Sequence, residues 1–371
     1  MYWQFKYYDV NNGPDWKSIE ENFSWFRDME AVQQDHIWHG EGNVQIHTKM
    51  VCEALISLPE FKSLGEQDKH IMFTSALMHD IEKRSTTTTE FKQGRECIVA
   101  PKHADRGDKT ARIILYKELA CPYHVREQIC KFIKWHGKPL HERSDNSMHK
   151  MAWGIKLRYL AMIAKADILG RTCTDAKEHL ERIDYFIMQA EDLRIIGGPR
   201  RFSSKLGEYE FLKNGNTYYE PFDESKFEVV MMSAIAGSGK DTYIKDYLSS
   251  WKVVSLDNIR KELKVKPTDK SGNGRVIQLA KERAKEFMRK KQNFVWNATN
   301  ITAQMRSQLI DLFESYGGKV TIVYIEVPYK TLISQNASRE AMVPISVMEK
   351  MVNNFEPPTR DEAYNIITYC N

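Results

Sequence analysis

The stretch from Phe227 to Leu248 constrains the fold of this chain more than any other part of its sequence. An apolar run with high strand propensity, Phe227 to Met232, leads into a turn of small residues, and Lys240 opens a segment compatible with a helix. A strand, a glycine-bearing turn, a lysine and a helix in that order form a phosphate-binding loop. In such a loop backbone N–H groups surround a phosphate and the helix N-terminus adds partial positive charge. The sequence therefore predicts a nucleotide-binding domain built on a parallel sheet.

The loop residues that we expect to bind nucleotide follow one another without a gap. Gly237 and Gly239 permit positive φ and a close backbone approach, and Lys240 can reach the β- and γ-phosphates of ATP or another NTP. Two positions depart from the usual pattern, since Ala234 replaces a glycine and Asp241 replaces a hydroxyl residue. Either Asp241 binds Mg²⁺ through water or the threonine after it supplies the hydroxyl, and the plainer alternative is a turn without a ligand. The expected nucleotide-binding set is Ala236, Gly237, Ser238, Gly239, Lys240, Asp241 and Thr242.

Three more apolar runs in the second half predict strands. They cover residues 251–256, 294–296 and 320–327, and helical segments separate them. Strands that alternate with helices predict a parallel sheet with helices on both faces. Asp257 follows the first run, at the edge where open α/β sheets place ligand groups, and Arg260 shares its helical face. We expect Asp257 to serve catalysis, with a helix N-cap as the alternative role.

The first half has a different chemistry, because all eleven histidines lie between His36 and His179. Apolar residues recur there at helical spacing, in segments 51–58, 69–78, 109–119, 124–135, 151–169 and 176–196. Residues 71–78 are apolar almost all round, which predicts a buried helix, and this segment runs into His79-Asp80. A buried titratable pair is costly unless another charge or a metal compensates it.

Two residues elsewhere in the first half could supply that compensation. His47 lies in a helical stretch before the buried segment, and Asp167 lies inside a later apolar helix. The pattern of His47, His79-Asp80 and Asp167 resembles the HD phosphohydrolase superfamily, whose members are all-helical. The resemblance implies that these four residues bind one or two divalent metals. The reaction would be hydrolysis of a phosphomonoester or phosphodiester.

The same resemblance extends to residues around this set. His103 and His136 lie in the interval where two-metal members place extra histidines, and Lys83 is a candidate catalytic contact to phosphate. Glu82 replaces a glycine that is common in the family, and His39 is a weaker candidate for a phosphate contact. Imidazole and carboxylate ligands suit Mn, Fe, Co, Ni or Zn better than Ca.

The second half, from about residue 227, resembles the 5′-polynucleotide kinase domain of phage and bacterial RNA end-repair enzymes. The matching elements are the loop at 234–242, Asp257-x-x-Arg260, Ala298-Thr299-Asn300, and Arg339 shortly before Val343-Pro344. The resemblance implies that Asp257 is the general base and that Arg260 contacts the acceptor phosphate. It further implies that Arg339 and Lys240 stabilise charge on the transferred group. Thr299 and Asn300 are weaker candidates for acceptor or phosphate contacts.

Taken together, the two halves resemble the HD-domain polynucleotide kinases, which are bifunctional RNA end-healing enzymes. The resemblance implies hydrolysis of 2′,3′-cyclic phosphate and 2′- or 3′-phosphate ends, and NTP-dependent phosphorylation of 5′-OH ends of RNA, with DNA also possible. A separate RNA ligase would seal the products. The residues leave two alternatives open. One is a nucleotide phosphohydrolase fused to a nucleoside or metabolite kinase, and the other is a non-enzymatic nucleotide-sensing module.

Composition and the positions of turn-forming residues predict how the chain divides into domains. We expect an all-α domain over residues 1–200, a linker with a β-hairpin at Asn214-Gly215-Asn216 over 201–226, and an α/β P-loop domain over 227–371. The sequence has no apolar run long enough for a membrane span and no secretory pattern at its amino terminus. Six cysteines without a Cys-x-x-Cys pair favour a reducing cytoplasm. The net charge of +4 permits a nucleic-acid partner through local basic patches only.

Overall fold

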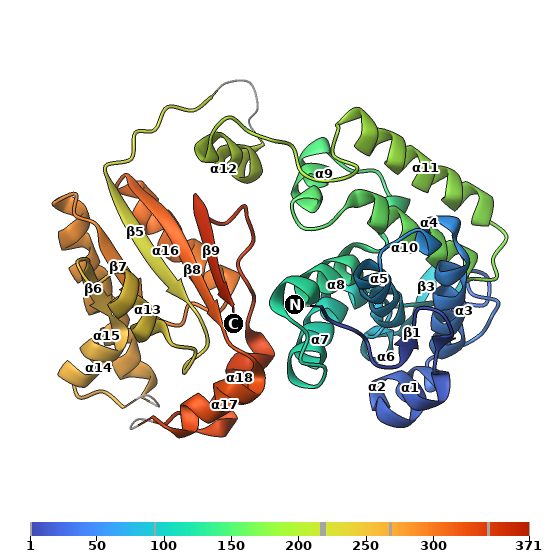
Figure 1. Ribbon diagram of the computed structural model, residues 1–371, viewed down its shortest axis with the longest axis horizontal. Coiled ribbons are helices and arrows are strands. Elements are labelled where there is room, and N and C mark those ends of the chain that lie inside the picture. Colours follow the sequence, from blue (N-terminus) through green and yellow to red (C-terminus); the bar gives the residue numbers. More distant parts are fainter. Residues whose placement is uncertain (1, 93, 216–219, 267–268, 340–341, 371) are drawn as a thin grey trace. The chain divides into compact units, whose positions relative to one another are not determined.

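The computed structural model describes residues 2–92, 94–215, 220–266, 269–339 and 342–370. The chain divides into two compact units, Met1–Arg200 and Arg201–Asn371, and each unit is described by itself (Figure 1). None of the described helices is both long and apolar enough to cross a membrane.

Unit 1, blue to green in Figure 1, is mainly helical. Its helices are α1 (Trp16–Asn22), α2 (Ser24–Arg27), α3 (Val44–Ser57), α4 (Pro59–Lys62), α5 (Glu66–Met78), α6 (Lys83–Thr86), α7 (His103–Lys117), α8 (Tyr123–Trp135), α9 (Asp145–Ala152), α10 (Leu157–Leu169) and α11 (Ala176–Asp192), with short 3₁₀ turns at Asp28–Ala31 and Lys138–Leu140. The expected buried helix is confirmed, because every residue of α5 from His70 to Met78 is buried. Helices α3, α8 and α10 pack around it and form one hydrophobic core.

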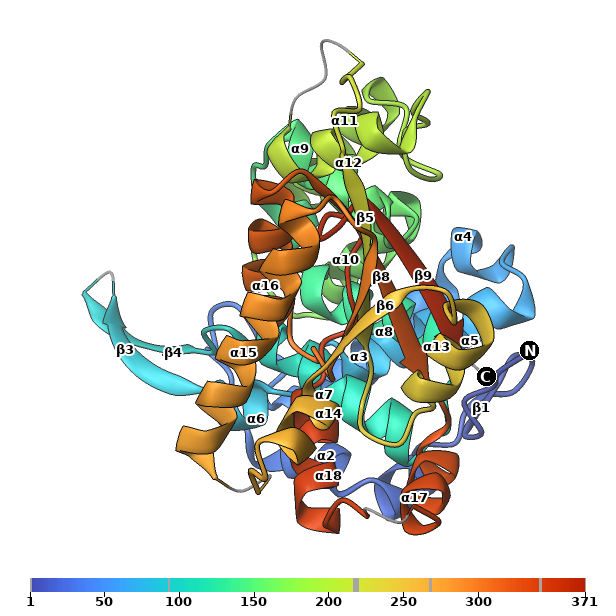
Figure 2. The same ribbon diagram turned by 90° about the vertical axis from the view of Figure 1, so that its left-hand side faces the viewer.

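The prediction that unit 1 is purely helical is wrong at two places. Strands β1 (Tyr8–Asp9) and β2 (Gly13–Pro14) form a short hairpin, and β3 (Thr88–Lys92) pairs antiparallel with β4 (Arg95–Val99). The β3–β4 hairpin extends from the rest of the unit in Figure 2. Its strands contain threonine, phenylalanine, isoleucine and valine, and β-branched and aromatic residues favour a pleated backbone over a helix.

Unit 2 is a five-stranded parallel sheet with helices. Its elements are α12 (Lys205–Asn214), β5 (Phe227–Ser233), α13 (Lys240–Tyr247), β6 (Lys252–Ser255), α14 (Leu256–Glu262), α15 (Lys270–Arg289), β7 (Phe294–Asn297), α16 (Ala303–Ser315), β8 (Gly318–Glu326), α17 (Tyr329–Ala337), α18 (Ile345–Asn354) and β9 (Asn365–Cys370). The strand order is β6-β7-β5-β8-β9, and all four strand pairs are parallel. The strand that leads into the glycine-bearing loop, β5, therefore lies in the middle of the sheet.

Alternate residues of β5 belong to two separate hydrophobic cores, as expected for a strand that is buried on both faces. Val229 and Met231 pack in a core with side chains of α15 and α16, whereas Val230 and Met232 pack in another with Ile244 of α13. The predicted sheet with helices on both faces is thus confirmed. Strand β9 extends the sheet beyond the strands that the apolar runs predicted.

The predicted β-hairpin in the linker is wrong for the described residues. Residues 205–214 form helix α12, which the Ser204 hydroxyl caps by accepting a hydrogen bond from the Gly207 amide. Gly215 ends the helix at a φ of 72°, the left-handed conformation that glycine adopts readily at this position. The asparagine–glycine pair is therefore a helix stop, and Asn216 lies outside the described residues.

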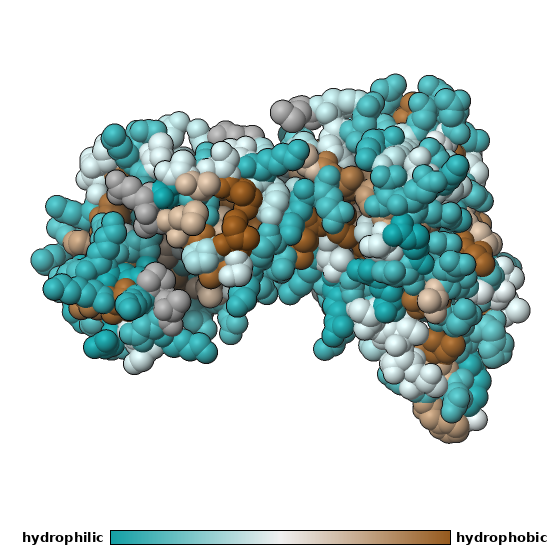
Figure 3. Space-filling view, turned by 90° about the horizontal axis from the view of Figure 1, so that it is seen from below, coloured by the Kyte–Doolittle hydropathy of each residue, from teal (hydrophilic) through white to brown (hydrophobic). Residues whose placement is uncertain are grey.

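The exposed hydrophobic residues are scattered over the surface. In the view of Figure 3, hydrophobic side chains form separate spots on a surface that is otherwise largely hydrophilic. The large exposed hydrophobic residues, which include Phe91 and Phe222, are spread along the chain. Scattered exposure of this kind is normal for units that each bury a core of their own.

Candidate metal centre and phosphate-binding loop

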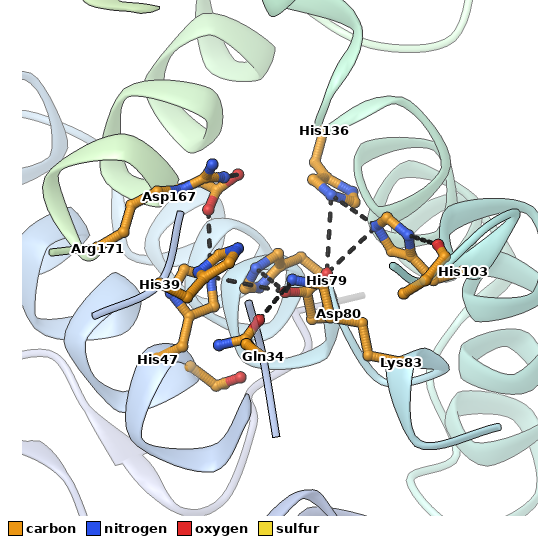
Figure 4. Close-up of polar contacts among 12 residues, drawn as sticks. Gln34, His39, His47, His79, Asp80, Lys83, His103, His136, Asp167 and Arg171 are labelled. Carbon is orange, nitrogen blue, oxygen red and sulfur yellow. Dashed lines mark hydrogen bonds and ion pairs between the residues drawn. The ribbon is translucent and has the colours of Figure 1, made fainter. Parts of the chain in front are cut away.

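The six histidines and aspartates predicted to bind metal form one cluster, in which four histidines surround Asp80 (Figure 4). On one side, the His79 Nε2 atom lies 3.1 Å and the His47 Nε2 atom 3.5 Å from the Asp80 Oδ2 atom. On the other side, the His103 and His136 Nε2 atoms lie 3.3 and 3.9 Å from the Asp80 Oδ1 atom. The Asp80 carboxylate thus belongs to two possible metal-binding groups, one on each oxygen.

Three helices bring four of these side chains together. His47 lies in α3, His79 and Asp80 directly follow α5, and Asp167 lies in α10, where its Oδ1 atom is 3.2 Å from the His47 Nε2 atom. His47, His79, Asp80 and Asp167 are between 0 and 2% exposed. The helices that form the core of unit 1 therefore also position the ligands.

Three of the histidines have the same tautomer, fixed by the backbone. The Nδ1 atoms of His79, His103 and His136 each lie 2.7 Å from the carbonyl oxygen three residues earlier. A carbonyl only accepts, so each Nδ1 carries the proton and donates it. Each Nε2 atom is left with a lone pair that points toward Asp80, which is the arrangement of a metal-binding imidazole.

The side chains fit a bound cation better than they fit one another. The His103 and His136 Nε2 atoms face each other at 3.3 Å with lone pairs on both. The Nε2 atoms of His47 and His79 and the Oδ1 atoms of Asp80 and Asp167 are buried with no hydrogen-bond partner among the described residues. Buried polar atoms without a partner cost about 1–3 kcal/mol each. One or two divalent metals between these atoms would satisfy them, so the donor set fits the predicted metals.

The charges inside the cluster shift its pKa values in opposite directions. Burial lowers the pKa of His136 to about 3, and neighbouring histidines add to the effect. Burial also opposes a charged His79, but the Asp80 and Asp167 carboxylates outweigh it and raise the pKa of this histidine. The pKa of Asp80 is held well below its usual range, because His79 and Lys83 outweigh its desolvation. These shifts favour a neutral His136 beside an ionised Asp80, the forms in which imidazole and carboxylate bind metal.

Two cations border the cluster. The Lys83 Nζ atom lies 2.7 Å from the Asp80 Oδ2 atom and donates a hydrogen bond to the Gln34 Oε1 atom. Arg171, one helical turn after Asp167, pairs with the Asp167 Oδ2 atom at 2.7 Å. Lys83 was predicted from its place after the His79-Asp80 pair, whereas Arg171 was missed. Its spacing of four residues from Asp167 was the available signal.

Glu41 was also missed. Its Oε1 atom lies 2.9 Å from the Nδ1 atoms of both His39 and His47, and its Oε2 atom accepts a hydrogen bond from the Thr172 amide. These contacts hold the pKa of Glu41 well below its usual range despite its desolvation. His39 therefore lies against Glu41, and burial lowers its pKa to about 4. A carboxylate at the Nδ1 atom of His47 directs the Nε2 lone pair of that histidine toward Asp80 and Asp167.

The glycine-bearing loop of unit 2 has the backbone expected of a phosphate-binding loop. Gly237 and Gly239 have φ values of 88° and 94°, and Gly239 directly precedes helix α13. The Ser238 hydroxyl and the Lys240 Nζ atom both donate to the Ile235 carbonyl oxygen, at 2.9 and 3.3 Å. Burial lowers the pKa of Lys240 to about 8, although Asp241 and Asp257 favour its charged form.

Asp241 has a defined partner in the sheet. The Asn297 Nδ2 atom, at the end of β7, donates to the Asp241 Oδ1 atom at 2.7 Å. The Asp241 side chain is otherwise exposed, as is Thr242 next to it. Asn297 thus orients one carboxylate oxygen and leaves the other available to a solvated metal ion.

Asp257 lies in the first turn of α14 and is exposed. The Ser255 hydroxyl caps this helix by accepting from the Asn258 amide, so Asp257 is not needed as the N-cap. Arg260 pairs with Asp257, and its Nε atom donates to the Asn273 Oδ1 atom at 3.0 Å. Asp257 and Lys240 are close enough for their charges to interact.

The remaining predicted residues of unit 2 have different positions. The Asn300 Nδ2 atom donates to the Met232 carbonyl oxygen, so this side chain supports the strand before the loop. Thr299 contributes its backbone, because its carbonyl accepts from the Ala234 amide. Arg339 follows α17, and its charge reaches Lys240. The contacts of Arg339 and Thr299 with substrate stay predictions.

One family model and two solved structures are similar to parts of this chain. Residues 229–358 match the family model of an AAA domain. A presumed kinase from Chloroflexus aurantiacus J-10-fl is 10% identical, with a TM-score of 0.35 over 40% of this chain and 86% of that one. An unliganded sugar kinase from Janibacter sp. HTCC2649 is 16% identical, with a TM-score of 0.31 over 39% of this chain and 85% of that one.

The match to the AAA model spans the central strand, the loop and the helices after it, and the parallel sheet places that loop at its carboxyl edge. Unit 2 is thus similar to an AAA domain over residues 229–358 and has a glycine-bearing loop of the P-loop type. An NTP with Mg²⁺ is the ligand that this loop implies.

Proposed function

We propose that this chain is a bifunctional RNA end-healing enzyme. Unit 1 would hydrolyse 2′,3′-cyclic phosphate and 2′- or 3′-phosphate ends, and unit 2 would phosphorylate 5′-OH ends from an NTP. The proposal rests on one observation, that the same chain has a histidine–aspartate cluster in unit 1 and a glycine-bearing loop in unit 2. Four histidines surround Asp80 in unit 1, with Asp167 against His47, and an exposed carboxylate, Asp257, lies near Lys240 in unit 2. The RNA substrate rests on the resemblance to HD-domain polynucleotide kinases.

In unit 1 the chain's own side chains suit a phosphate ester. His47, His79, Asp80 and Asp167 would hold one metal, and Asp80, His103 and His136 a second one. A divalent metal there would polarise a phosphoryl oxygen and activate water. Lys83 and Arg171 border the cluster, and their positive charges would stabilise the negative charge of the transition state of phosphate hydrolysis.

In unit 2 the proposed roles follow from position and charge. The backbone around Gly237 and Gly239 would hold the triphosphate, and Lys240 would neutralise its β- and γ-phosphates. Asp257 would accept the proton of the attacking hydroxyl. Arg260, which pairs with Asp257, would turn to the acceptor phosphate when the substrate binds.

The test is an end-labelling assay with separate readouts. A 5′-OH RNA with a 2′,3′-cyclic phosphate is incubated with labelled ATP and Mg²⁺ plus Mn²⁺, Ni²⁺ or Co²⁺, and both termini are followed. The proposal expects a labelled 5′ end and a 3′ end with free hydroxyls. Label transfer to free nucleosides but not to RNA would instead favour a metabolite kinase. Nucleotide binding without turnover at either end would favour a sensing module.

A further inference from the structure

We propose that an exposed basic corner between α14 and α15 binds the sugar-phosphate backbone of the acceptor strand. The corner consists of Lys261, Lys264, Lys266, Lys270 and Arg275. This inference rests on the kinase role proposed for unit 2 and specifies its substrate. The acceptor would be a strand with several phosphates downstream of its 5′-OH, rather than a nucleoside or a metabolite.

The corner has a local excess of basic residues, although the chain as a whole is nearly neutral. Residues 260–275 contain six basic and two acidic residues, whereas the whole chain of 371 residues has a net charge of only +4. Both acidic residues are occupied. Glu262 pairs with Arg283 at 2.7 Å, and Asp269 caps α15 by accepting from the Gly272 amide.

The five cations of the corner are not used inside the protein. All five are exposed, and none forms an ion pair or a side-chain hydrogen bond with another residue in the part of the chain that the structure describes. Like charges on one short turn repel one another and destabilise the fold slightly. An external polyanion would remove that repulsion, because its phosphates bind several of the cations at once.

The fold fixes the corner next to the proposed general base. The Arg260 side chain joins Asp257 in α14 to Asn273 in α15, so the two ends of the corner are tied together. Between them, the Val265 amide donates to the Arg260 carbonyl oxygen and the Val265 side chain is buried in the core of the sheet. We place the strand whose 5′-OH is held at Asp257 over the lysines of the corner, since these follow Asp257 on α14, on α15 and in the residues between the two helices.

The length of the acceptor then decides how much of the corner it reaches. A nucleoside 3′-monophosphate has one phosphate, which Arg260 would contact. Each further nucleotide adds a phosphate that a corner lysine can neutralise with release of counterions. Affinity should therefore rise with acceptor length and fall with salt, whereas the affinity for ATP should not depend on the charges of the corner.

The experiment compares K264E/K270E with R289E/K290E. The second variant makes the same charge change with two exposed residues at the far end of α15, about 30 Å from Lys270 by the rise of the helix. Binding of a 3′-fluorescein 12-nucleotide RNA with a 5′-OH is followed by anisotropy between 50 and 200 mM KCl. Thermal melts verify that both variants fold.

We expect K264E/K270E to weaken RNA binding at least tenfold and to reduce the slope of log affinity against log salt by about 1.4, two contacts of about 0.7 each. The control should stay within twofold of wild type. In kinase assays, the KM for the 12-mer should rise at least tenfold, while the KM values for ATP and for a nucleoside 3′-monophosphate change less than twofold.

Equal effects of the two variants, or an equal rise in KM for the short and the long acceptor, would overturn the inference. Failure of the proposed function has a different signature. Salt-dependent RNA binding that K264E/K270E weakens, without label transfer to any RNA, would remove the kinase role and leave the binding surface. Normal label transfer to RNA in K264E/K270E would remove the surface and leave the kinase.

Discussion

The two centres hold their charged groups in opposite ways. In unit 1, His47, His79, Asp80 and Asp167 are buried, and a backbone carbonyl fixes the tautomer of His79. In unit 2, the Asp257 side chain is 69% exposed and forms an ion pair with the Arg260 guanidinium. The loop around Gly237 and Gly239 offers backbone groups to a ligand instead of buried charges.

This difference indicates how each centre depends on its ligand. Buried lone pairs and carboxylates that face one another are costly without a cation, so the fold of unit 1 should be coupled to metal binding. An exposed carboxylate and a glycine-bearing loop cost little without a nucleotide. Unit 2 should therefore fold well by itself and become ordered for catalysis when its substrates bind.

The largest expected effect follows from removing the charge that both metal groups share. Asp80→Asn keeps the shape of the side chain but replaces one oxygen with an NH₂ group that cannot bind metal. We expect at least a 100-fold loss of metal affinity, larger than the 10–100-fold typical of residues that only support a ligand. Metal content after dialysis against Mn²⁺ measures this. Asp184→Asn, at an exposed position of α11, is the control, and retention of metal by Asp80→Asn would contradict the assignment of the cluster.

Metal removal should destabilise unit 1 and spare unit 2. A metal at 100 times its dissociation constant stabilises a folded unit by about 2.7 kcal/mol, which for a unit of this size is about 5–10 °C in melting temperature. Calorimetry with a chelator and with added Mn²⁺ should show one transition that moves by this amount and one that does not. A shift of both transitions, or of neither, would count against a buried cluster that differs from the exposed loop.

We expect Glu41 to affect metal affinity through its contact with His47. Glu41→Gln keeps a side chain of the same size but weakens the control of the His47 tautomer, and we expect a 10–100-fold loss of metal affinity. The measurement is a metal titration followed by calorimetry. Glu53→Gln, an exposed residue of the same helix α3, should change nothing. Equal affinity in Glu41→Gln and wild type would show that Glu41 only holds the loop at Thr172.

The smallest effect concerns the proton on Lys240. Its pKa of about 8 lies below the usual value for lysine, so part of the free protein has a neutral Lys240 above pH 8. A bound triphosphate favours the charged form and raises this pKa. ATP binding should therefore take up a fraction of a proton at pH 8.5 and almost none at pH 6.5. Calorimetry in two buffers of different ionisation enthalpy measures it, and Lys240→Met should abolish the uptake.

Local patterns were sufficient to predict the scaffold of both units. The apolar run before His79 predicted buried helix α5, and the strand, glycines and lysine around Gly237 predicted β5, the loop and α13. These features are encoded within a few residues of one another. The wrong prediction at Asn214-Gly215 shows the limit, since the same dipeptide serves a hairpin or a helix end and the Ser204 cap decides between them.

The supporting residues of the sites could not be predicted in this way. Glu41 bridges His39 and His47 and also accepts from the amide of Thr172, a residue 131 positions away. Asn297 reaches Asp241 only because β7 lies beside β5 in the sheet. Such contacts depend on how distant segments pack, and no spacing in the sequence records them.

The most direct test of the central claim, that one chain contains two independent phosphate-handling centres, is a comparison of Asp80→Ala and Asp257→Ala on one substrate. An RNA with a 5′-OH and a 2′,3′-cyclic phosphate is incubated with ATP, Mg²⁺ and Mn²⁺, and both ends are quantified. We predict that Asp80→Ala leaves the cyclic phosphate intact and phosphorylates the 5′ end within twofold of wild type, and that Asp257→Ala does the reverse. Loss of both activities in either folded variant would contradict the account.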